Sequence, residues 1–202
     1  MLQSRLASFA FVIGACLLTC NSSIAASFST VVIDAGHGGF DRGGIPSNIL
    51  PEKGVALDVA RRLRTYLADA GLRTVMTRSS DTFVTLDRRV AIANAQRHVI
   101  FVSIHFNSAR RKGANGIETF YASARAKKLA SLIQRNAMKT TSGENRGIKK
   151  ARYYVLRNSR IPAVLIECGF LTNPQDAKRA SGSEYRDRLA RQIARAIVDF
   201  RP

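Results

Sequence analysis

Cysteine is scarce in this 202-residue chain, and two of its three cysteines lie within the first 26 residues. If that segment is removed, only Cys168 remains and no internal disulfide can form. The chain also lacks internal repeats and long stretches rich in proline and serine. These absences exclude a disulfide-stapled scaffold and argue against domains joined by a flexible linker. They leave one globular domain that is held by its hydrophobic core, with or without a metal.

The first 26 residues differ in kind from the rest of the chain. They contain one arginine, an apolar run from Leu6 to Leu18 and small residues at their end. Such a run is too short to favour a membrane-spanning helix, and this order of features is typical of a secretory signal peptide. We therefore expect a signal peptide over residues 1–26, with an A-x-A-like site ending at Ala25, and one domain over residues 27–202. The alternative is a lipoprotein signal, because "IGAC" at Cys16 resembles a lipidation site. Either way the protein is expected to be exported, to the periplasm or cell envelope.

Acidic residues are also few, with 14 Asp and Glu against 32 Lys and Arg, for a net charge of +18. A charge of this size attracts polyanions. For an exported protein the nearest polyanions are those of the cell envelope: wall polymers, anionic lipid headgroups and lipopolysaccharide. Solubility alone would also account for exposed basic helix faces. We expect electrostatic contact with anionic envelope polymers, no nucleic-acid partner, and a monomer.

Strand and helix patterns alternate along the remaining sequence. Short apolar runs predict six strands, at residues 29–34, 73–77, 99–106, 116–122, 153–156 and 163–170. Helical spacing of apolar residues predicts four helices, at residues 53–70, 85–96, 124–140 and 185–200. The second of these helices should bury Leu86, Val90 and Ala93, and residues 140–150 are expected to form a loop. This alternation predicts a single α/β domain: a mostly parallel or mixed twisted sheet of about six strands with helices on both faces.

Polar residues with metal-binding or proton-transfer chemistry follow several of these strands. His37 lies in "TVVIDAGHGGFDRGG" after the first strand, His105 closes "VIFVSIH" and Glu167 closes "AVLIE". Glu52 is expected in the loop before the first helix, where it can return over His37. In open α/β sheets the chemistry gathers beyond the carboxyl ends of the strands. Two imidazoles and a carboxylate are a catalytic zinc set with one open position for water, and a spare carboxylate, Glu167, can take the proton.

Each of these residues also has a structural explanation when it is taken alone. His37 can be a turn residue in an anion-binding loop, and His105 a hydrogen-bonded core histidine. Glu167 can pair with an arginine, and Glu52 can favour a helix N-terminus. The combination is more specific than any member. His98 is expected on the surface, at the opposite end of its strand from His105.

Six blocks, in this order, resemble the zinc-dependent N-acetylmuramoyl-L-alanine amidases of the type-3 family. They are "VVIDAGHGGFDRGG", "EKGVALDVARRL", "TVMTRSSDTFVTLDRRVAIAN", "FVSIHFNS", "GIETFY" and "YYVLRNSRIPAVLIECGFLTN". The resemblance implies one Zn²⁺ held by His37, Glu52 and His105, with Glu167 catalytic. It also matches Asn107 to a site-shaping asparagine. The implied reaction is hydrolysis of the peptidoglycan amide between N-acetylmuramic acid and L-alanine of the stem peptide.

The chain departs from the family pattern at three positions. Gly54 stands where a polar or acidic residue is frequent, Phe106 replaces a smaller residue, and Cys168 replaces an aliphatic one. None of these changes removes a ligand, although Phe106 has the size to narrow the site. Some relatives carry a long insertion whose helix blocks the zinc, and residues 121–153 have no room for one.

Three alternative functions are compatible with the sequence. A zinc peptidase would cut elsewhere in the stem peptide. A cysteine peptidase would use Cys168 with His105, but Cys168 and Glu167 are neighbours on a strand and must point to opposite faces. A non-catalytic wall-binding protein fits the net charge, although it gives no reason for the intact ligand set.

Overall fold

The structure, a computed structural model, describes residues 28–44, 50–111 and 113–201. The expected signal peptide and the alternative lipid attachment at Cys16 fall outside these residues. Six described strands form one sheet: β1 (Thr30–Ala35), β2 (Arg73–Met76), β3 (Val99–Asn107), β4 (Ile117–Tyr121), β5 (Asn145–Lys150) and β6 (Ala163–Phe170). Their order is β2-β1-β3-β6-β4-β5, and the β4–β6 pair is antiparallel while the other pairs are parallel. The predicted mixed sheet is confirmed.

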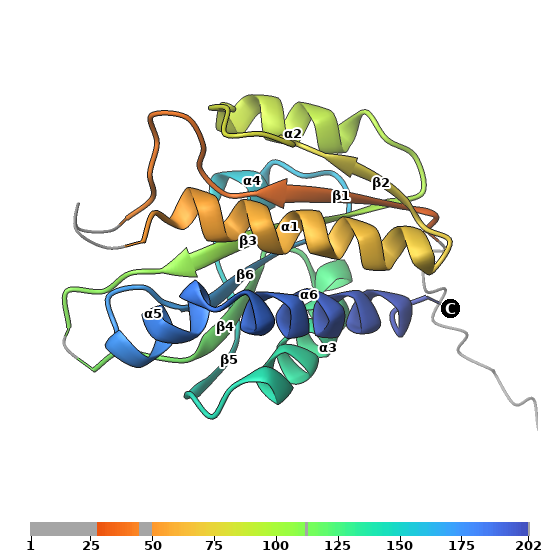
Figure 1. Cartoon of the computed structure of the whole chain (residues 1–202). Coiled ribbons are helices and arrows are strands. Elements are labelled where there is room, and N and C mark those ends of the chain that lie inside the picture. Colours follow the sequence, from red (N-terminus) through yellow and green to blue (C-terminus); the bar gives the residue numbers. More distant parts are fainter. Residues whose placement is uncertain (1–27, 45–49, 112, 202) are drawn as a thin grey trace, which may run out of the picture.

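Helices cover both faces of this sheet (Figure 1). The helices and short 3₁₀ turns are α1 (Glu52–Asp69), α2 (Leu86–Asn94), η1 (Ala124–Ala126), α3 (Lys127–Ala137), η2 (Met138–Thr140), α4 (Tyr154–Arg157), α5 (Pro174–Ser181) and α6 (Ser183–Val198). Helices α1, α3 and α6 pack together on one face, and α2 and α4 contact each other and the sheet on the other. Within the described residues, no helix combines the length and the apolar character needed to cross a bilayer.

The core consists of two hydrophobic clusters, one on each face of the sheet. Alternation along β6 places Val164, Ile166 and Cys168 in the larger cluster, beneath α1, α3 and α6. Leu165 belongs to the smaller cluster, beneath α2 and α4. The same period of two directs Glu167 toward the α2 and α4 side, which is the face that carries fewer helices.

Two local predictions are wrong, one of a strand and one of a loop. Tyr153–Leu156 was expected as a strand, but Tyr154–Arg157 is the short helix α4. Residues 145–150, expected in a loop, form β5 at the edge of the sheet. Because β5 is an edge strand with half of its residues exposed, it has no alternating apolar pattern; lysines are common on such edges.

Three further details differ from expectation. Glu52 is the first residue of α1 rather than part of the preceding loop. Leu86, expected to be inward, is 53% exposed at the start of α2. Helix α5, which begins at Pro174 behind an Asn173 cap, was not predicted because its eight residues contain little apolar pattern. Gly71 does follow the end of α1, with φ of 73°, as its role in ending that helix requires.

Candidate metal centre and catalytic pocket

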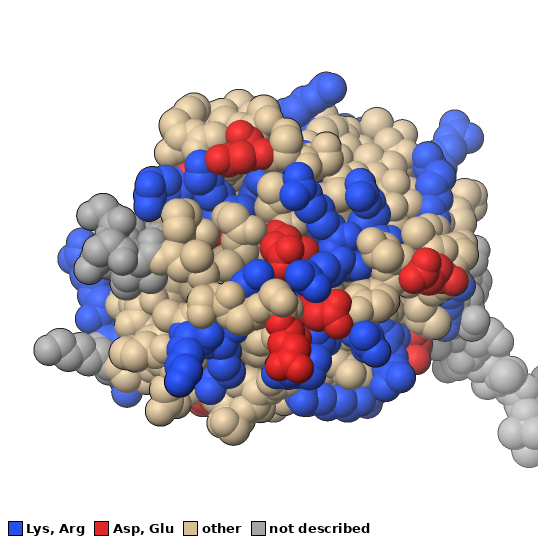
Figure 2. Space-filling model, in the orientation of Figure 1, with Lys and Arg blue, Asp and Glu red and all other residues tan. Residues whose placement is uncertain are grey.

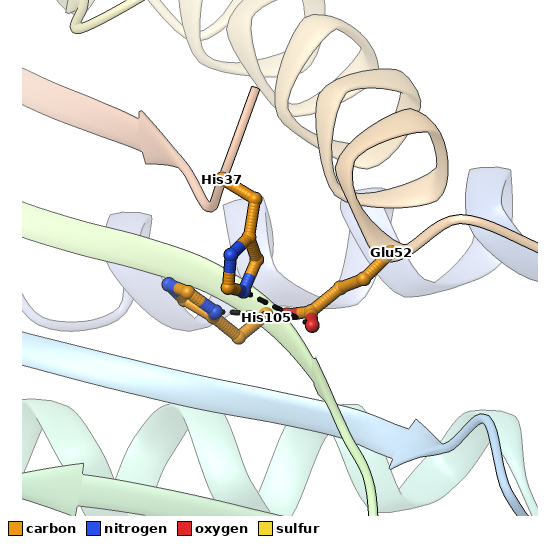
Figure 3. A group of neighbouring side chains, drawn as sticks. All are labelled: His37, Glu52 and His105. Atoms are coloured by element: carbon orange, nitrogen blue, oxygen red, sulfur yellow. Dashed lines mark hydrogen bonds and ion pairs between the residues drawn. The ribbon is translucent and has the colours of Figure 1, made fainter. Parts of the chain in front are cut away.

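Two histidines and a glutamate converge at the carboxyl ends of β1 and β3 (Figure 3). His37 lies on the loop after β1, His105 is on β3, and Glu52 opens α1. Their possible ligand atoms all lie within 4.8 Å of one another. The His37 Nε2 atom is 3.0 Å from Glu52 Oε2, and the His105 Nδ1 atom is 2.8 Å from Glu52 Oε1. The structure therefore brings together the three residues predicted as metal ligands.

Glu52 is held as a carboxylate between the two imidazoles. Burial alone would raise its pKa, but hydrogen bonds from His105 and His37 lower it to about 2. Burial alone would lower the pKa of His105, but the hydrogen bond and charge of Glu52 raise it to about 9. The same balance raises the pKa of His37. The carboxylate is thus the fixed negative charge around which the site is organised, and a cation is its natural partner.

The loop that carries His37 approaches its surroundings too closely for larger residues. His37 has φ of 58°, a left-handed conformation that is uncommon outside glycine. A Cβ atom on Gly36 would lie 2.4 Å from the His105 ring. At Gly38, where φ is 132°, a Cβ atom would lie 2.2 Å from the Thr82 carbonyl oxygen. Glycine is needed here so that the chain can present His37 directly beside His105.

Asp41 orients the His37 ring, a role that the sequence prediction missed. One Asp41 carboxylate oxygen, Oδ2, lies 2.8 Å from His37 Nδ1, on the ring edge opposite the Glu52 contact. The other, Oδ1, accepts a hydrogen bond from the Gly43 backbone N–H. Carboxylates in this position fix the tautomer of metal-binding histidines, so that Nε2 is free for the ion. The signal in the sequence is the spacing of four residues in "HGGFD".

Arg89 of α2 is buried and binds the backbone of the loop that carries His37. Its guanidinium forms an ion pair of 2.7 Å with Asp34, near the end of β1, and donates to the carbonyl oxygens of Ala35 and His37. Asp34 is also buried and accepts hydrogen bonds from Thr77 and Ser103. The Arg89 guanidinium and the Asp34 carboxylate thus fix the backbone that presents His37.

A second buried arginine, Arg78, follows β2 and joins the loop after β1 to the start of α1. Its partners are the carbonyl oxygens of Ala35, Gly36 and Lys53. Lys53 directly follows Glu52, so one guanidinium ties the His37 loop to the start of α1. Neither arginine was predicted from the sequence, because the residues that they fix are distant in the chain. Arg78 is 43 residues from Ala35 and 25 from Lys53, and Arg89 is 54 residues from Ala35.

Glu167 faces the metal-binding residues from the neighbouring strand. It pairs with His105 in the β3–β6 register and lines the same pocket of about 550 Å³. Its Oε2 atom is buried and has no hydrogen-bond partner within the described part of the chain. Burial, the largest effect, raises the pKa of Glu167 to about 7. A carboxyl group in this state exchanges protons readily near neutral pH.

Cys168 lies on the other side of the sheet from this pocket. Its side chain is fully buried within the larger hydrophobic cluster, and burial raises the pKa of the thiol. The thiol therefore cannot form a nucleophile–base pair with His105, and the cysteine-peptidase alternative is wrong. Phe106 also packs into that cluster, while its backbone N–H donates to Glu52.

Asn107 lies at the edge of the pocket and is fixed by two hydrogen bonds. Its amide nitrogen donates to Glu118 over 2.6 Å, and its oxygen accepts from the backbone of Ser108. Glu118 is paired in turn with Arg146 and Lys149. This charged group, Glu118 with Arg146 and Lys149, was not predicted. It lies at the start of β4 and on β5, beyond Glu167 in the strand order.

His98, the remaining histidine, is exposed at the opposite end of β3 from His105, as predicted. Its backbone carbonyl accepts hydrogen bonds from the backbone of Ser29 and Thr30. It takes no part in the pocket.

Residues 31–199 match the family described as N-acetylmuramoyl-L-alanine amidase. The N-acetylmuramoyl-L-alanine amidase LytC of Bacillus subtilis is 38% identical over 175 residues, which are 85% of this chain and 35% of LytC. The uncharacterized protein YqiI of the same organism is 40% identical over 85% of this chain and 84% of its own length. The chain thus spans about a third of LytC but most of YqiI.

A solved structure with the same fold is the catalytic domain of CwlV, an N-acetylmuramoyl-L-alanine amidase from Bacillus (Paenibacillus) polymyxa. It superposes with a TM-score of 0.82 at 35% identity, over 86% of this chain and 98% of that domain.

Proposed function

Because this chain belongs to the type-3 N-acetylmuramoyl-L-alanine amidases, we propose that it hydrolyses the amide between N-acetylmuramic acid and L-alanine in peptidoglycan, with one zinc ion bound by His37, Glu52 and His105. The observation that carries this proposal is the convergence of the three ligand residues beside a carboxylate, Glu167, that has an unpartnered oxygen. As an exported protein it would meet this substrate in the periplasm or cell envelope.

The residues present suit zinc. Two imidazole nitrogens and one carboxylate oxygen are the ligand set of catalytic zinc sites that keep one position open. Glu52 supplies the negative charge, and Asp41 fixes His37 as an outer partner does in zinc proteins. A bound zinc would act there as a Lewis acid toward the scissile carbonyl and toward water.

Glu167 is proposed to move the proton. In its ionised form it accepts a proton from the attacking water, and it then donates that proton to the nitrogen of the leaving L-alanine. Its buried Oε2 atom is free for this exchange, because no protein group within the described residues occupies it. Asn107 is proposed to shape the pocket wall, and its bond to Glu118 holds the amide in one orientation.

The identity of the bond that is cut tests this function. Purified peptidoglycan would be incubated with the protein, and the soluble products analysed by mass spectrometry. We expect free stem peptides that begin with L-alanine, together with glycan chains that have lost them, and no release after the zinc is removed by a chelator. Peptides cut between two amino acids would instead identify a zinc peptidase. Binding without any release would identify a non-catalytic wall-binding protein.

A further inference from the structure

Two phenylalanines beside the pocket are exposed and stacked on each other. Phe40 is 80% exposed and Phe83 is 39% exposed. Their ring centroids are 4.2 Å apart and the rings are inclined by 30°. Exposed apolar clusters are costly in water and usually mark a binding surface. We call Phe40 and Phe83 the aromatic platform.

The platform is held rigidly by the two loops that carry it. The backbone N–H of Gly39 donates to Asp81 over 2.8 Å, while Lys53 donates to the Gly39 carbonyl and to Asp81. A Cβ atom on Gly39 would lie 2.8 Å from the Phe83 backbone nitrogen, so the two loops are in direct contact. A surface that is ordered before binding loses little conformational entropy when a ligand arrives.

The platform joins the pocket through Phe83. Phe83 lines the pocket together with His37, and the loops of both phenylalanines follow β1 and β2. The charged group, Glu118 with Arg146 and Lys149, lies on the β4 and β5 side of Glu167. Along the sheet, the catalytic residues therefore lie between the aromatic platform, of which Phe83 lines the pocket, and the charged group, which contacts the pocket wall through Asn107.

This asymmetry matches the two halves of the substrate in the proposed function, on which the present inference rests. The stem peptide carries carboxylates and amides, which charged side chains can bind. A saccharide ring has one face of C–H groups, which packs on a flat aromatic ring while its hydroxyl groups stay in water. We propose that the aromatic platform binds a saccharide ring of the glycan strand and so sets the direction in which the substrate lies across the pocket.

Substitutions of Phe40 separate ring stacking from general apolar contact. Phe40→Ala removes the ring, Phe40→Leu keeps an apolar side chain without a ring, and Phe40→Trp keeps an aromatic face. Each variant would be assayed on a disaccharide-peptide and on a lactoyl-peptide that has the same amide but no sugar. Circular dichroism would verify that each variant is folded.

On the disaccharide-peptide, we expect Phe40→Ala and Phe40→Leu to raise KM by about tenfold, with kcat nearly unchanged and Phe40→Trp close to the original protein. On the sugar-free peptide all four proteins should have the same KM. An unchanged KM for folded Phe40→Ala on the disaccharide-peptide, or equal losses on both substrates, would overturn the proposal. So would a variant that kept this KM and instead lost binding to anionic phospholipid vesicles. Failure of the original protein to cut either amide would refute the proposed function itself.

Discussion

Glu167 occupies an unusual position for an acidic side chain in a strongly basic protein. Its pocket has arginine nearby, yet Arg89 is committed to Asp34 and to backbone carbonyls. The Oε2 atom of Glu167 consequently has no partner among the described residues, and burial raises the pKa of this group to about 7. Burying an acceptor without a partner is destabilising, and a catalytic role explains why the chain tolerates it.

Replacing Glu167 by glutamine should therefore remove most of the turnover and leave the fold intact. Glutamine keeps the shape of the side chain but cannot accept the proton of the attacking water. We expect a rate loss of about 10²–10⁴-fold with unchanged zinc content, measured by product release from peptidoglycan and by metal analysis of the same samples.

The matched control is Cys168→Ala on the adjacent residue. Its thiol packs in the core on the far side of the sheet, so this variant should lose some stability but keep its turnover. Near-normal activity of Glu167→Gln, or a folded but inactive Cys168→Ala, would contradict the assignment.

At the residue scale, the sequence identifies those groups that follow strands. His37, His105 and Glu167 could be predicted because each one ends or closely follows an apolar run that predicts a strand. Arg78 and Arg89 could not, because nothing in the local pattern distinguishes a buried arginine from the many exposed ones. Their role depends on contacts between segments that are distant in the sequence, such as the 55 residues that separate Asp34 from Arg89.

At the scale of elements, α2 stabilises the catalytic loop through Arg89 rather than through its apolar face alone. Arg89→Met would leave the Asp34 charge buried and unpaired, which typically costs about 3–5 kcal/mol of unfolding free energy. Denaturant unfolding at neutral pH would measure this loss. The control is Arg88→Met on the same helix, which is exposed and should change the free energy by less than about 0.5 kcal/mol.

The loss caused by Arg89→Met should also depend on pH. Burial alone would raise the pKa of Asp34, but Arg89 and the hydrogen bonds to its carboxylate lower it below 3.8. A lowered pKa stabilises the folded state above the unfolded value of 3.8, and this contribution disappears as the pH falls through the folded value. Without Arg89, burial dominates and raises the pKa of Asp34. The free energy of unfolding of Arg89→Met should therefore approach that of the original protein as the pH falls. If the difference in unfolding free energy between the original protein and Arg89→Met did not change with pH, this account of the Asp34–Arg89 pair would be wrong.

The elements themselves could be predicted where burial imposes a pattern. Strand β3 opens with the unbroken apolar run Val99–Val102 because both of its faces are covered there, and α1 and α6 carry regular inward apolar stripes. Strand β5 was expected to be a loop because the sheet edge leaves it half exposed, and α4 was expected to be a strand because a four-residue helix is too short to show a period. Tertiary contacts alone determine the structure of such segments.

At the scale of the whole molecule, the face shown in Figure 2 carries positive charge that is not confined to one patch. Figure 2 shows Lys and Arg distributed over one whole face, with a few acidic residues among them. Removal of residues 1–26, which contain one arginine and no acidic residue, would reduce the net charge from +18 to +17. A distributed field of this kind favours attraction to an extended anionic polymer over recognition of one ligand.

We therefore expect binding to cell walls to weaken as salt rises, because such attraction is screened over about 8 Å at physiological ionic strength. Cleavage of a small soluble muropeptide should change much less. Sedimentation with insoluble walls and turnover of the muropeptide would be measured in one salt series. If wall binding and muropeptide turnover depended equally on salt, attraction between the basic surface and the wall would not explain the result.

The same assay tests whether the protein acts without an activating partner. Between β4 and β5 the chain holds only η1, α3 and η2 with short connections, and α3 already packs against the sheet and α6. No described segment there is spare to cover the pocket, so the purified protein should cleave the muropeptide unaided. If the purified protein cleaved the muropeptide only after a partner protein was added, another part of the chain would have to inhibit the active site.

The central claim is that His37, Glu52 and His105 hold one zinc ion, and metal analysis of the purified protein tests it most directly. Each residue would be changed to alanine in turn, with His98→Ala as the control, because His98 is exposed at the far end of β3. We predict one zinc per chain in the original protein and in His98→Ala, and loss of zinc from each of the three site variants while the fold is retained. Full zinc occupancy in folded His105→Ala would contradict the account.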